Sequence, residues 1–415
     1  FYMFYYIIVS LDLSSLALLM ITYFQTFKIF SALYKFSSLS FLNSVNFFMK
    51  HKQTQSFEEQ LGFYTVGNIQ NFQKGQKNSF FQFLQEHPHI KIDSLLYYSE
   101  AQLQDINFPP DLYDLLFAVK NKQSDFHQEL TELKQSGIHL IPSSSIHYPK
   151  TLRAKLINST LPPILYCKGE IKLLTKEISA ILSTQKVSPN KHIQTRLLLE
   201  NIQNKNLALL CGVGSETDEL TFEFAIQHNH PLIIILSRGI LANGYLPFEL
   251  RKPSIPENIL IISFFPPYQR SSEKSELSRL KMIHSIAERS YIVDIRRNSV
   301  SWKAALQALK DKMKLILVEN ERQADTHISL YVRGAGLVDS SLQYRYQDSF
   351  PTLLNAFLSK EKASLAKIKK HFDLSLSQEL LREDLTSLPD IYTEKIGNRI
   401  YYRTKNETLD QLQLF

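Results

Sequence analysis

Two polar loops follow apolar runs of the sequence and carry residue types that can hold phosphate groups. The first loop follows residues 178–182, and its candidate contacts are Ser183, Thr184, Gln185, Lys186 and Ser188. The second follows residues 207–210, and its candidates are Gly212, Gly214 and Asp218. Backbone N–H groups at a strand-to-helix turn face an anion, and the helix dipole assists them. The residue types in both loops thus allow contacts with an anion.

Basic residues that follow predicted strands or open predicted helices could converge on one edge. They are Lys186, Arg279, Lys281, Arg296, Arg297 and Lys303. Such contacts would bind phosphates without reading base sequence. Trp302, Tyr268 and Phe265 could stack on bases. Core packing is the alternative for these aromatic residues, and ordinary surface solvation is the alternative for the cations.

A catalytic interpretation has little support in the residue pattern. His284 and Asp294 could act as an acid and a base, but His284 lies in an apolar helical pattern that is typical of a packed histidine. The sequence has no nucleophile elbow and no P-loop. Cys167 and Cys211 lie in apolar runs, and no Cys/His cluster has the spacing of a zinc site. We therefore expect no catalytic residues, no metal and no cofactor.

Short apolar runs alternate with helical patterns from residue 138 onward, and several runs are unbroken, as in strands buried on both faces. The predicted strands are 138–141, 164–166, 178–182, 207–210, 232–236, 259–262, 291–294 and 314–318. The predicted helices between them are 193–202, 219–227, 277–288 and 301–309. This alternation predicts an α/β domain over residues 138–340, with a doubly wound Rossmann-like parallel sheet. Ligands of such sheets bind outside the carboxyl ends of the strands.

Further segments flank the predicted sheet. Residues 49–137 have helical patterns and predict an N-terminal helical domain. Residues 340–351 are polar and predict a linker. Residues 352–405 contain three short helical patterns and a hairpin with Gly397 and Asn398 at its turn, which predict a winged-helix domain. A small helical bundle used for protein contacts is the alternative.

The first 48 residues form a separate apolar segment. Residues 3–24 are long enough for a transmembrane helix, but Asp12 lies near their middle, where a charge is costly. No basic region precedes them, which argues against a secretory signal. Three interpretations stay open: a membrane anchor, a buried helical pair, or sequence upstream of a start at Met49. The membrane anchor is the least favoured of the three.

The composition indicates a globular chain with several domains. Its 415 residues are 44% hydrophobic and 21% charged, and 47 Lys and Arg stand against 40 Asp and Glu. A net charge of +7 permits a polyanionic partner without requiring one. The two apolar cysteines favour a reducing cytoplasm. Only 12 glycines are present, less than half of what average usage of about 7% would give, and phosphate-cradling loops usually need glycine.

Ordered landmarks in the central part resemble the DNA-processing DprA/Smf family. Residues 147–152, HYPKTL, precede residues 161–169, LPPILYCKG, and this pair resembles the entry to the family's Rossmann-like domain. Residues 211–218, CGVGSETD, resemble a Ser-Gly-x-Ala-x-Gly-Ile-Asp turn, in which Gly212 and Asp218 match. Residues 236–240, 263–267, 279–283 and 299–301 resemble later elements, and the order of domains also fits. The resemblance implies that Arg238, Gly239, Ser299 and Ser301 contact DNA phosphates.

The chain departs from the family pattern in its loops. Ser183 and Gln185 stand where the family has the glycine and the arginine of a Gly-Ser/Thr-Arg loop. Glutamine lacks the bidentate fork with which arginine holds phosphate, although Lys186 could restore some charge. Glu216 replaces a glycine and places an anion where a phosphate would lie. These departures argue against an intact phosphate pocket.

The resemblance implies a cytoplasmic protein that binds single-stranded DNA without catalysis, loads a RecA-type recombinase and assists natural transformation. It also implies a possible homodimer. One alternative is a degenerate member that acts as a protein-interaction module. Another is an enzyme like the nucleotide phosphoribohydrolases that share this sheet, although their Gly-Gly-x-Gly-Thr-x-x-Glu loop is absent from the sequence.

Overall fold

The computed structural model describes residues 56–155, 162–183, 189–252, 254–318, 325–339 and 342–405. Nearly all of these residues belong to one compact unit, Glu58–Phe415. The expectations for residues 1–48 lie outside the described residues, as do those for Thr184, Gln185, Lys186 and Ser188. No helix in the described ranges has both the length and the apolar composition that crossing a bilayer requires.

The segment before the sheet is helical, as predicted. Its elements are α4 (Phe57–Asn68), α5 (Lys74–Glu86), α6 (Ile92–Leu95), α7 (Glu100–Asp105), the short 3-10 helix η1 (Pro110–Leu112) and α8 (Tyr113–Gln135). Ser99 caps α7 by accepting the Gln102 N–H, which satisfies an end group that would otherwise lack a partner. The phenolic oxygen of Tyr64 donates to Glu129 over 2.8 Å and joins α4 to α8.

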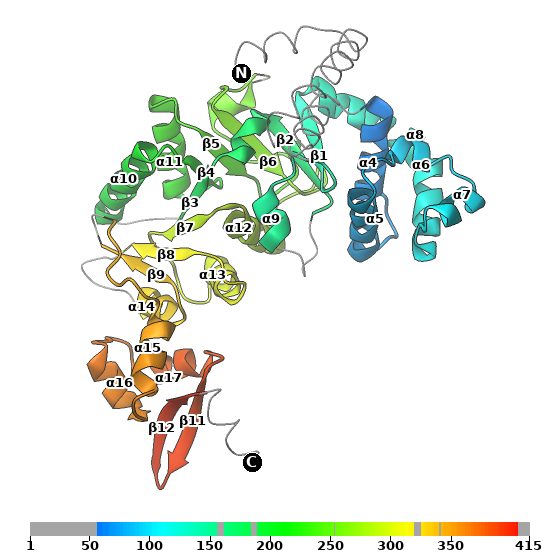
Figure 1. The fold of residues 1–415 in the computed structure, drawn as a ribbon. Coiled ribbons are helices and arrows are strands. Elements are labelled where there is room, and N and C mark those ends of the chain that lie inside the picture. The colour runs from blue at the N-terminus through cyan, green and yellow to red at the C-terminus, as the bar shows by residue number, and fades with distance from the viewer. Residues whose placement is uncertain are drawn as a thin grey trace, which may run out of the picture. The chain divides into compact units, whose positions relative to one another are not determined.

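The central domain is a nine-stranded sheet with helices on both faces (Figure 1). Its strands are β1 (Ile138–Pro142), β2 (Ile164–Gly169), β3 (Ile178–Leu182), β4 (Ala208–Cys211), β5 (Leu232–Ile235), β6 (Ile259–Ser263), β7 (Arg289–Ile292), β8 (Leu315–Val318) and β9 (Gly336–Val338). Its helices are α9 (Lys150–Lys155), α10 (Pro189–Asn204), α11 (Glu216–Gln227), α12 (Glu273–Ile286), α13 (Val300–Lys310) and α14 (Asp325–Val332), with 3-10 turns η2 (Ile171–Thr175) and η3 (Phe248–Arg251).

The strand order is β1-β2-β6-β5-β4-β3-β7-β8-β9. The strands from β3 to β9 are parallel, whereas β1 pairs antiparallel with β2 and β2 pairs antiparallel with β6. The prediction of a wholly parallel sheet is therefore wrong at one edge. The connection between β1 and β2, residues 143–163, contains α9 and is long enough for a parallel crossover, so its length does not decide the direction of β2. The strand order reverses between β3 and β7, where doubly wound sheets hold their ligands.

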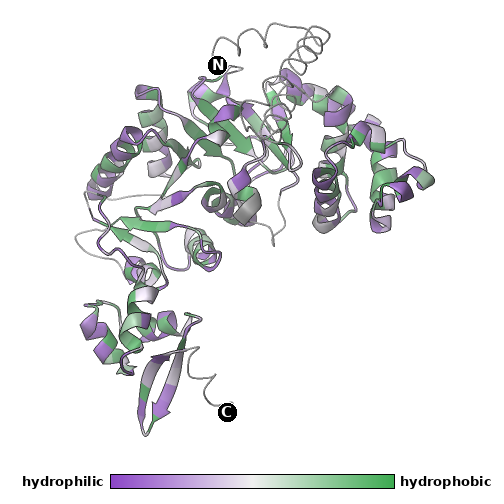
Figure 2. Ribbon diagram, in the orientation of Figure 1, coloured by the Kyte–Doolittle hydropathy of each residue, from purple (hydrophilic) through white to green (hydrophobic). Residues whose placement is uncertain are grey.

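Alternating side chains divide the sheet's core between its two faces. Ala180, Leu210 and Ile233 pack on the face covered by α9 and α12, whereas Ile181 and Leu209 pack on the face covered by α10 and α11. Figure 2 shows that the strands are apolar and that many helices carry hydrophilic segments. Successive side chains of a strand point to opposite faces, so these unbroken apolar runs reflect burial on both sides.

The C-terminal part contains three helices and a small antiparallel sheet in the order β10-β12-β11. Its elements are α15 (Phe350–Leu358), β10 (Ala363–Ser364), α16 (Leu365–His371), α17 (Gln378–Thr386), β11 (Ile391–Ile396) and β12 (Arg399–Thr404). The predicted hairpin is confirmed, with Gly397 at its turn in the left-handed region. Part of the predicted linker instead extends the central sheet, because Tyr344 forms an antiparallel bridge with Val338.

The C-terminal elements and the central domain share one hydrophobic cluster. Phe350 and Leu354 of α15 belong to the same cluster as Leu330 of α14 and Leu317 of β8. An ionic network supplements this packing. The Nε of Arg333 donates to Asp384 of α17 over 2.7 Å, and Nη2 of Arg297 donates to Glu383 over 2.9 Å.

Candidate functional site at the carboxyl edge of the sheet

The loop after β4 closes on itself through Asp218. One carboxylate oxygen of Asp218 accepts the Gly212 N–H over 2.9 Å, and the other accepts the Ser215 N–H over 3.0 Å. Ser215 caps α11 in return by accepting the Asp218 N–H. Two backbone donors of this turn, at Gly212 and Ser215, therefore already bind an intramolecular carboxylate.

Arg279 lies below the same loop and is buried. Its guanidinium donates through Nε to Glu276 over 3.0 Å, and Nη2 pairs with the other oxygen of that carboxylate. Nη1 has no hydrogen-bond partner and lies against Gly212. Burial opposes the charge, but the neighbouring Glu276, followed by Asp218, raises the pKa of Arg279. Glu276, three residues earlier on the helix, is a signal that sequence reasoning missed.

The end of β3 meets α10 and α11 through polar contacts. The hydroxyl groups of Ser183 and Thr217 lie 2.5 Å apart. Lys191 of α10 forms an ion pair with Asp294, which follows β7. His192 lies 3.1 Å from Glu216 at the start of α11. The reversal point of the sheet thus contains paired charges, and neither Lys191 nor His192 was predicted from the sequence.

Arg238 holds the segment that follows β5. Its side chain is 8% exposed, and its guanidinium donates to the carbonyl oxygens of Ala242 over 2.7 Å and Tyr245 over 3.1 Å. Burial lowers the pKa of Arg238. Gly239 packs against the Pro266 and Pro267 carbonyls so closely that a β-carbon there would lie 2.1 and 2.3 Å from their oxygens. Both residues thus shape the loop.

The remaining predicted contacts lie at two helices on one face. Ser299 caps α13, accepting the Trp302 N–H over 3.1 Å and donating to the Arg296 carbonyl oxygen. Ser301 is the second residue of α13, and Lys281 is exposed on α12. Trp302 and Phe265 are buried, in agreement with core packing rather than base stacking. Tyr268 is 55% exposed, and its hydroxyl donates to Glu132.

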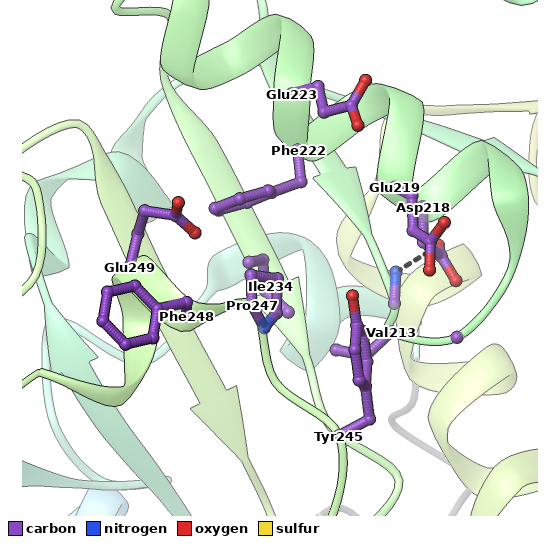
Figure 3. Close-up of a pocket in the computed structure, with 12 residues that line it drawn as sticks. Val213, Asp218, Glu219, Phe222, Glu223, Ile234, Tyr245, Pro247, Phe248 and Glu249 are labelled. Atoms are coloured by element: carbon purple, nitrogen blue, oxygen red, sulfur yellow. Dashed lines mark hydrogen bonds between the residues drawn. The ribbon is translucent and has the colours of Figure 1, made fainter.

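The carboxyl edge of the sheet carries positive charge on one side and negative charge on the other. Exposed cations lie at its α12 and α13 side, namely Lys274, Arg296 and Lys303. The side between β4 and β5 instead contains the carboxylates of Asp218, Glu219, Glu223 and Glu249 around a cleft (Figure 3). No group of His, Cys, Asp and Glu among the described residues could hold a metal ion.

This fold, with its reversal point between β3 and β7 and its glycine turn after β4, defines a Rossmann-like nucleotide-fold domain. Residues 139–342 match the sequence model of the family DNA recombination-mediator protein A. These residues therefore form a domain of the DNA-processing DprA/Smf family. No curated protein matches the chain.

A solved structure of DNA processing protein A shares the fold. The protein from Streptococcus pneumoniae superposes with a TM-score of 0.51 at 14% identity, over 73% of this chain and 98% of that one. The protein from Helicobacter pylori, whose single-stranded DNA binding mode has been described, gives a TM-score of 0.40 at 18% identity, over 54% of this chain and 97% of that one.

Proposed function

We propose that this chain is a DNA-processing protein that binds single-stranded DNA without catalysing a reaction. Family membership of the central domain supports DNA processing. The observation that carries the binding proposal is the group of exposed cations Lys274, Arg296 and Lys303 at the carboxyl edge, where ligands of doubly wound sheets bind. Phosphate contacts of this kind provide affinity without sequence selectivity.

The three cations lie on neighbouring elements. Lys274 lies in the first turn of α12, Lys303 lies in α13, and Arg296 lies in the connection between β7 and α13. Lys303 approaches Glu273 to 3.6 Å, but both side chains are more than half exposed, so the pair is weak and open to competition from phosphate. No described carboxylate lies within 4.0 Å of the charged groups of Lys274 and Arg296.

This assignment moves the phosphate contacts away from two arginines proposed on sequence grounds. Arg279 is buried against Glu276, and Arg297 is paired with Glu383. For Arg279 a buried ion pair would have to break before it could bind phosphate, at the cost of leaving the Glu276 carboxylate without its partner. Lys281 stays a candidate, because it is exposed on α12 seven residues after Lys274 and therefore on the same helix face.

The finer expectations of the family resemblance are part of the same proposal. A RecA-type recombinase would receive the bound strand, natural transformation would be the process served, and the chain would work in the cytoplasm, with a homodimer as a possible assembly. The three helices and hairpin of the C-terminal part would form a winged helix. Its exposed hairpin contains Lys395 and Arg399, which suits a second contact with nucleic acid.

The test compares two triple variants that remove equal charge from opposite edges of the sheet. The carboxyl-edge variant is Lys274→Ala with Arg296→Ala and Lys303→Ala. The amino-edge control is Lys172→Ala with Lys176→Ala and Lys205→Ala, three exposed cations near the starts of β3 and β4. Binding of a labelled oligonucleotide is measured across a salt series.

The carboxyl-edge variant should bind at least ~10-fold more weakly at low salt, and its slope of log K against log salt should fall by about 2, given ~0.7 per phosphate contact. The control should match the wild type. Equal losses in both variants would refute the carboxyl-edge assignment. Absence of binding by the wild type at low salt would refute DNA binding and favour the second candidate.

That second candidate is a family member that acts as a protein-interaction module. Glu216 at the start of α11 favours it, because this residue puts a carboxylate where the family pattern has a glycine. An enzyme of the nucleotide phosphoribohydrolase type would instead release a base from a nucleotide, and a turnover assay with nucleoside monophosphates distinguishes it.

A further inference from the structure

A cleft of about 260 Å³ opens at the carboxyl ends of β4 and β5, beside the edge proposed for DNA. The turn after β4, the outer side of α11 and the segment around η3 line it. Figure 3 shows the rings of Phe222, Tyr245 and Phe248 around its centre, with the carboxylates of Glu223 and Glu249 on either side of Phe222.

The charge of the cleft is negative and uncompensated. Glu219, Glu223 and Glu249 line it, and no lysine or arginine does. None of the three carboxylates forms an ion pair or a side-chain hydrogen bond within the described part of the chain. Glu219 and Glu223 are four residues apart on α11, so like charges face the same side. A phosphate would be repelled here, whereas a cation would be attracted.

The aromatic walls are exposed and already face one cation. Phe248 is 68% exposed and Tyr245 is 55% exposed, unusually high values for large rings. The ammonium group of Lys252 lies 5.4 Å from the centre of the Phe248 ring. Ring faces attract cations within about 6 Å. Rings and carboxylates together therefore favour a ligand that has a positive charge and a flat or apolar body.

The segment that carries these rings is held rigidly. Arg238 anchors the Tyr245 carbonyl oxygen, and Arg251 donates to the Leu246 carbonyl oxygen over 2.7 Å. Gly244 allows the close approach, because a β-carbon there would lie 2.4 Å from Nε of Arg238. The cleft wall is thus built in advance, which lowers the entropic cost of binding.

We propose that this cleft binds the guanidinium group of an arginine side chain from a partner protein. A planar guanidinium can stack on an aromatic ring while its edge donates two parallel hydrogen bonds to a carboxylate, whereas an ammonium group cannot do both. The inference is independent of the DNA proposal, because it concerns a cationic ligand on the opposite side of the edge.

The test measures binding of a blocked Gly-Ser-Arg-Ser-Gly peptide to the full chain by calorimetry or saturation-transfer NMR. Matched peptides carry lysine or the neutral isostere citrulline in place of arginine. The arginine peptide should bind saturably, the lysine peptide several-fold more weakly and the citrulline peptide not at all. Equal binding of the arginine and citrulline peptides, or no saturable binding of the arginine peptide, would overturn the proposal.

Variants locate the site. Glu219→Gln with Glu223→Gln, and separately Phe248→Ala, should weaken arginine binding at least ~10-fold. Asp111→Asn with Asp114→Asn removes the same charge from exposed positions at the start of α8 and should leave binding unchanged. Equal effects of the cleft and control variants would refute the assignment. Spermidine is tested as a competitor. If it displaces the peptide and binds more tightly than the peptide does, the ligand is a polyamine, and the proposal of a protein arginine is wrong.

Oligonucleotide binding of the same variants separates this inference from the DNA proposal. The cleft variants should bind the oligonucleotide as the wild type does, or slightly more tightly, because negative charge has been removed. A loss of oligonucleotide binding together with arginine binding would contradict the separation of the two sites.

Discussion

A β-carbon placed on Gly212 would lie 1.2 Å from Nη1 of Arg279. The glycine is therefore required by the buried guanidinium, in addition to any role in the turn after β4. Arg279 in turn is fixed by Glu276 on its own helix. This relationship converts a glycine and an arginine that resemble phosphate contacts into parts of a packed and neutralised cluster.

The first prediction concerns Gly212→Ala. The added methyl group must displace the Arg279 guanidinium from Glu276, so the free energy of unfolding should fall by about 2–4 kcal/mol. Urea unfolding followed by circular dichroism measures the change. Arg279→Leu should cost stability by itself, but the double variant should cost clearly less than the sum of the two single changes.

Gly75→Ala provides the control for that series. Gly75 lies in helix α5, and a β-carbon there would meet no atom within 4 Å. Alanine should therefore leave stability unchanged or raise it by up to about 1 kcal/mol. Additive costs of Gly212→Ala and Arg279→Leu would show that the two residues do not interact.

The second prediction concerns the ionic contact between the central and C-terminal elements. The Asp384 side chain is fully buried, and Arg333 is its cationic partner. Arg333→Ala should lower the free energy of unfolding by about 3 kcal/mol, because it leaves a buried carboxylate without its partner. A double-mutant cycle with Asp384→Asn, measured by urea unfolding, should give a coupling energy above about 1 kcal/mol.

The surface pair Lys122–Asp125 is the comparison, with both side chains more than half exposed. Breaking it should cost less than about 1 kcal/mol. A coupling energy near zero for Arg333 and Asp384 would mean that the hydrophobic cluster around Phe350 and Leu330 alone holds the C-terminal elements in place.

The third prediction is a pH dependence set by His327. Burial, and secondarily the nearby Lys191, lowers the pKa of this histidine to about 4. The ordinary pKa of a histidine is about 6.5. Between about pH 6.5 and pH 4 the unfolded chain binds a proton that the folded chain does not, so stability should fall as the pH decreases and level off below pH 4. The total loss should be about 3 kcal/mol.

His327→Gln should remove this part of the pH profile in urea unfolding measured at a series of pH values. His139→Gln is the control, because His139 is exposed on β1 and its replacement should leave the profile unchanged. An unchanged slope in His327→Gln would contradict the assignment of the slope to this histidine.

The fourth prediction concerns Arg238 as the positioning residue for the segment after β5. Arg238→Ala removes two buried hydrogen bonds to that segment, so backbone amides of residues 239–249 should exchange faster with deuterium. Arg238→Lys should give exchange rates between those of the wild type and Arg238→Ala, because one ammonium group cannot reproduce the planar arrangement of guanidinium donors. Arg270→Ala, an exposed residue, is the control; equal exchange in all variants would contradict the role.

Most elements of the central domain were predictable from local pattern. The strands at 178–182, 259–262 and 314–318 coincide with β3, β6 and β8 to within one residue, because parallel strands buried on both faces leave unbroken apolar runs. The antiparallel edge was not predictable in this way. Apolar runs such as those of β1 and β2 specify burial, whereas direction depends on the course of the connection, which the apolar pattern does not encode.

The site was predicted less completely. Its location at the carboxyl edge follows from the order of strands and helices, and Gly212 and Asp218 do lie together there. The roles of Arg279 and Arg238 did not follow from residue type, because a guanidinium can bind a phosphate, a carboxylate or a carbonyl oxygen with similar geometry. The cleft wall from Tyr245 to Glu249 carried no periodic signal.

The sequence by itself determined the α/β class, the family resemblance and the placement of polar turns after buried strands, since these depend on local apolar patterning and short motifs. Only the tertiary structure decided which charges are neutralised. Burial and pairing depend on contacts between residues far apart in the chain, such as Arg333 with Asp384 and Lys191 with Asp294. Those contacts left Lys274, Arg296 and Lys303 exposed at one side of the edge and an acidic aromatic cleft at the other.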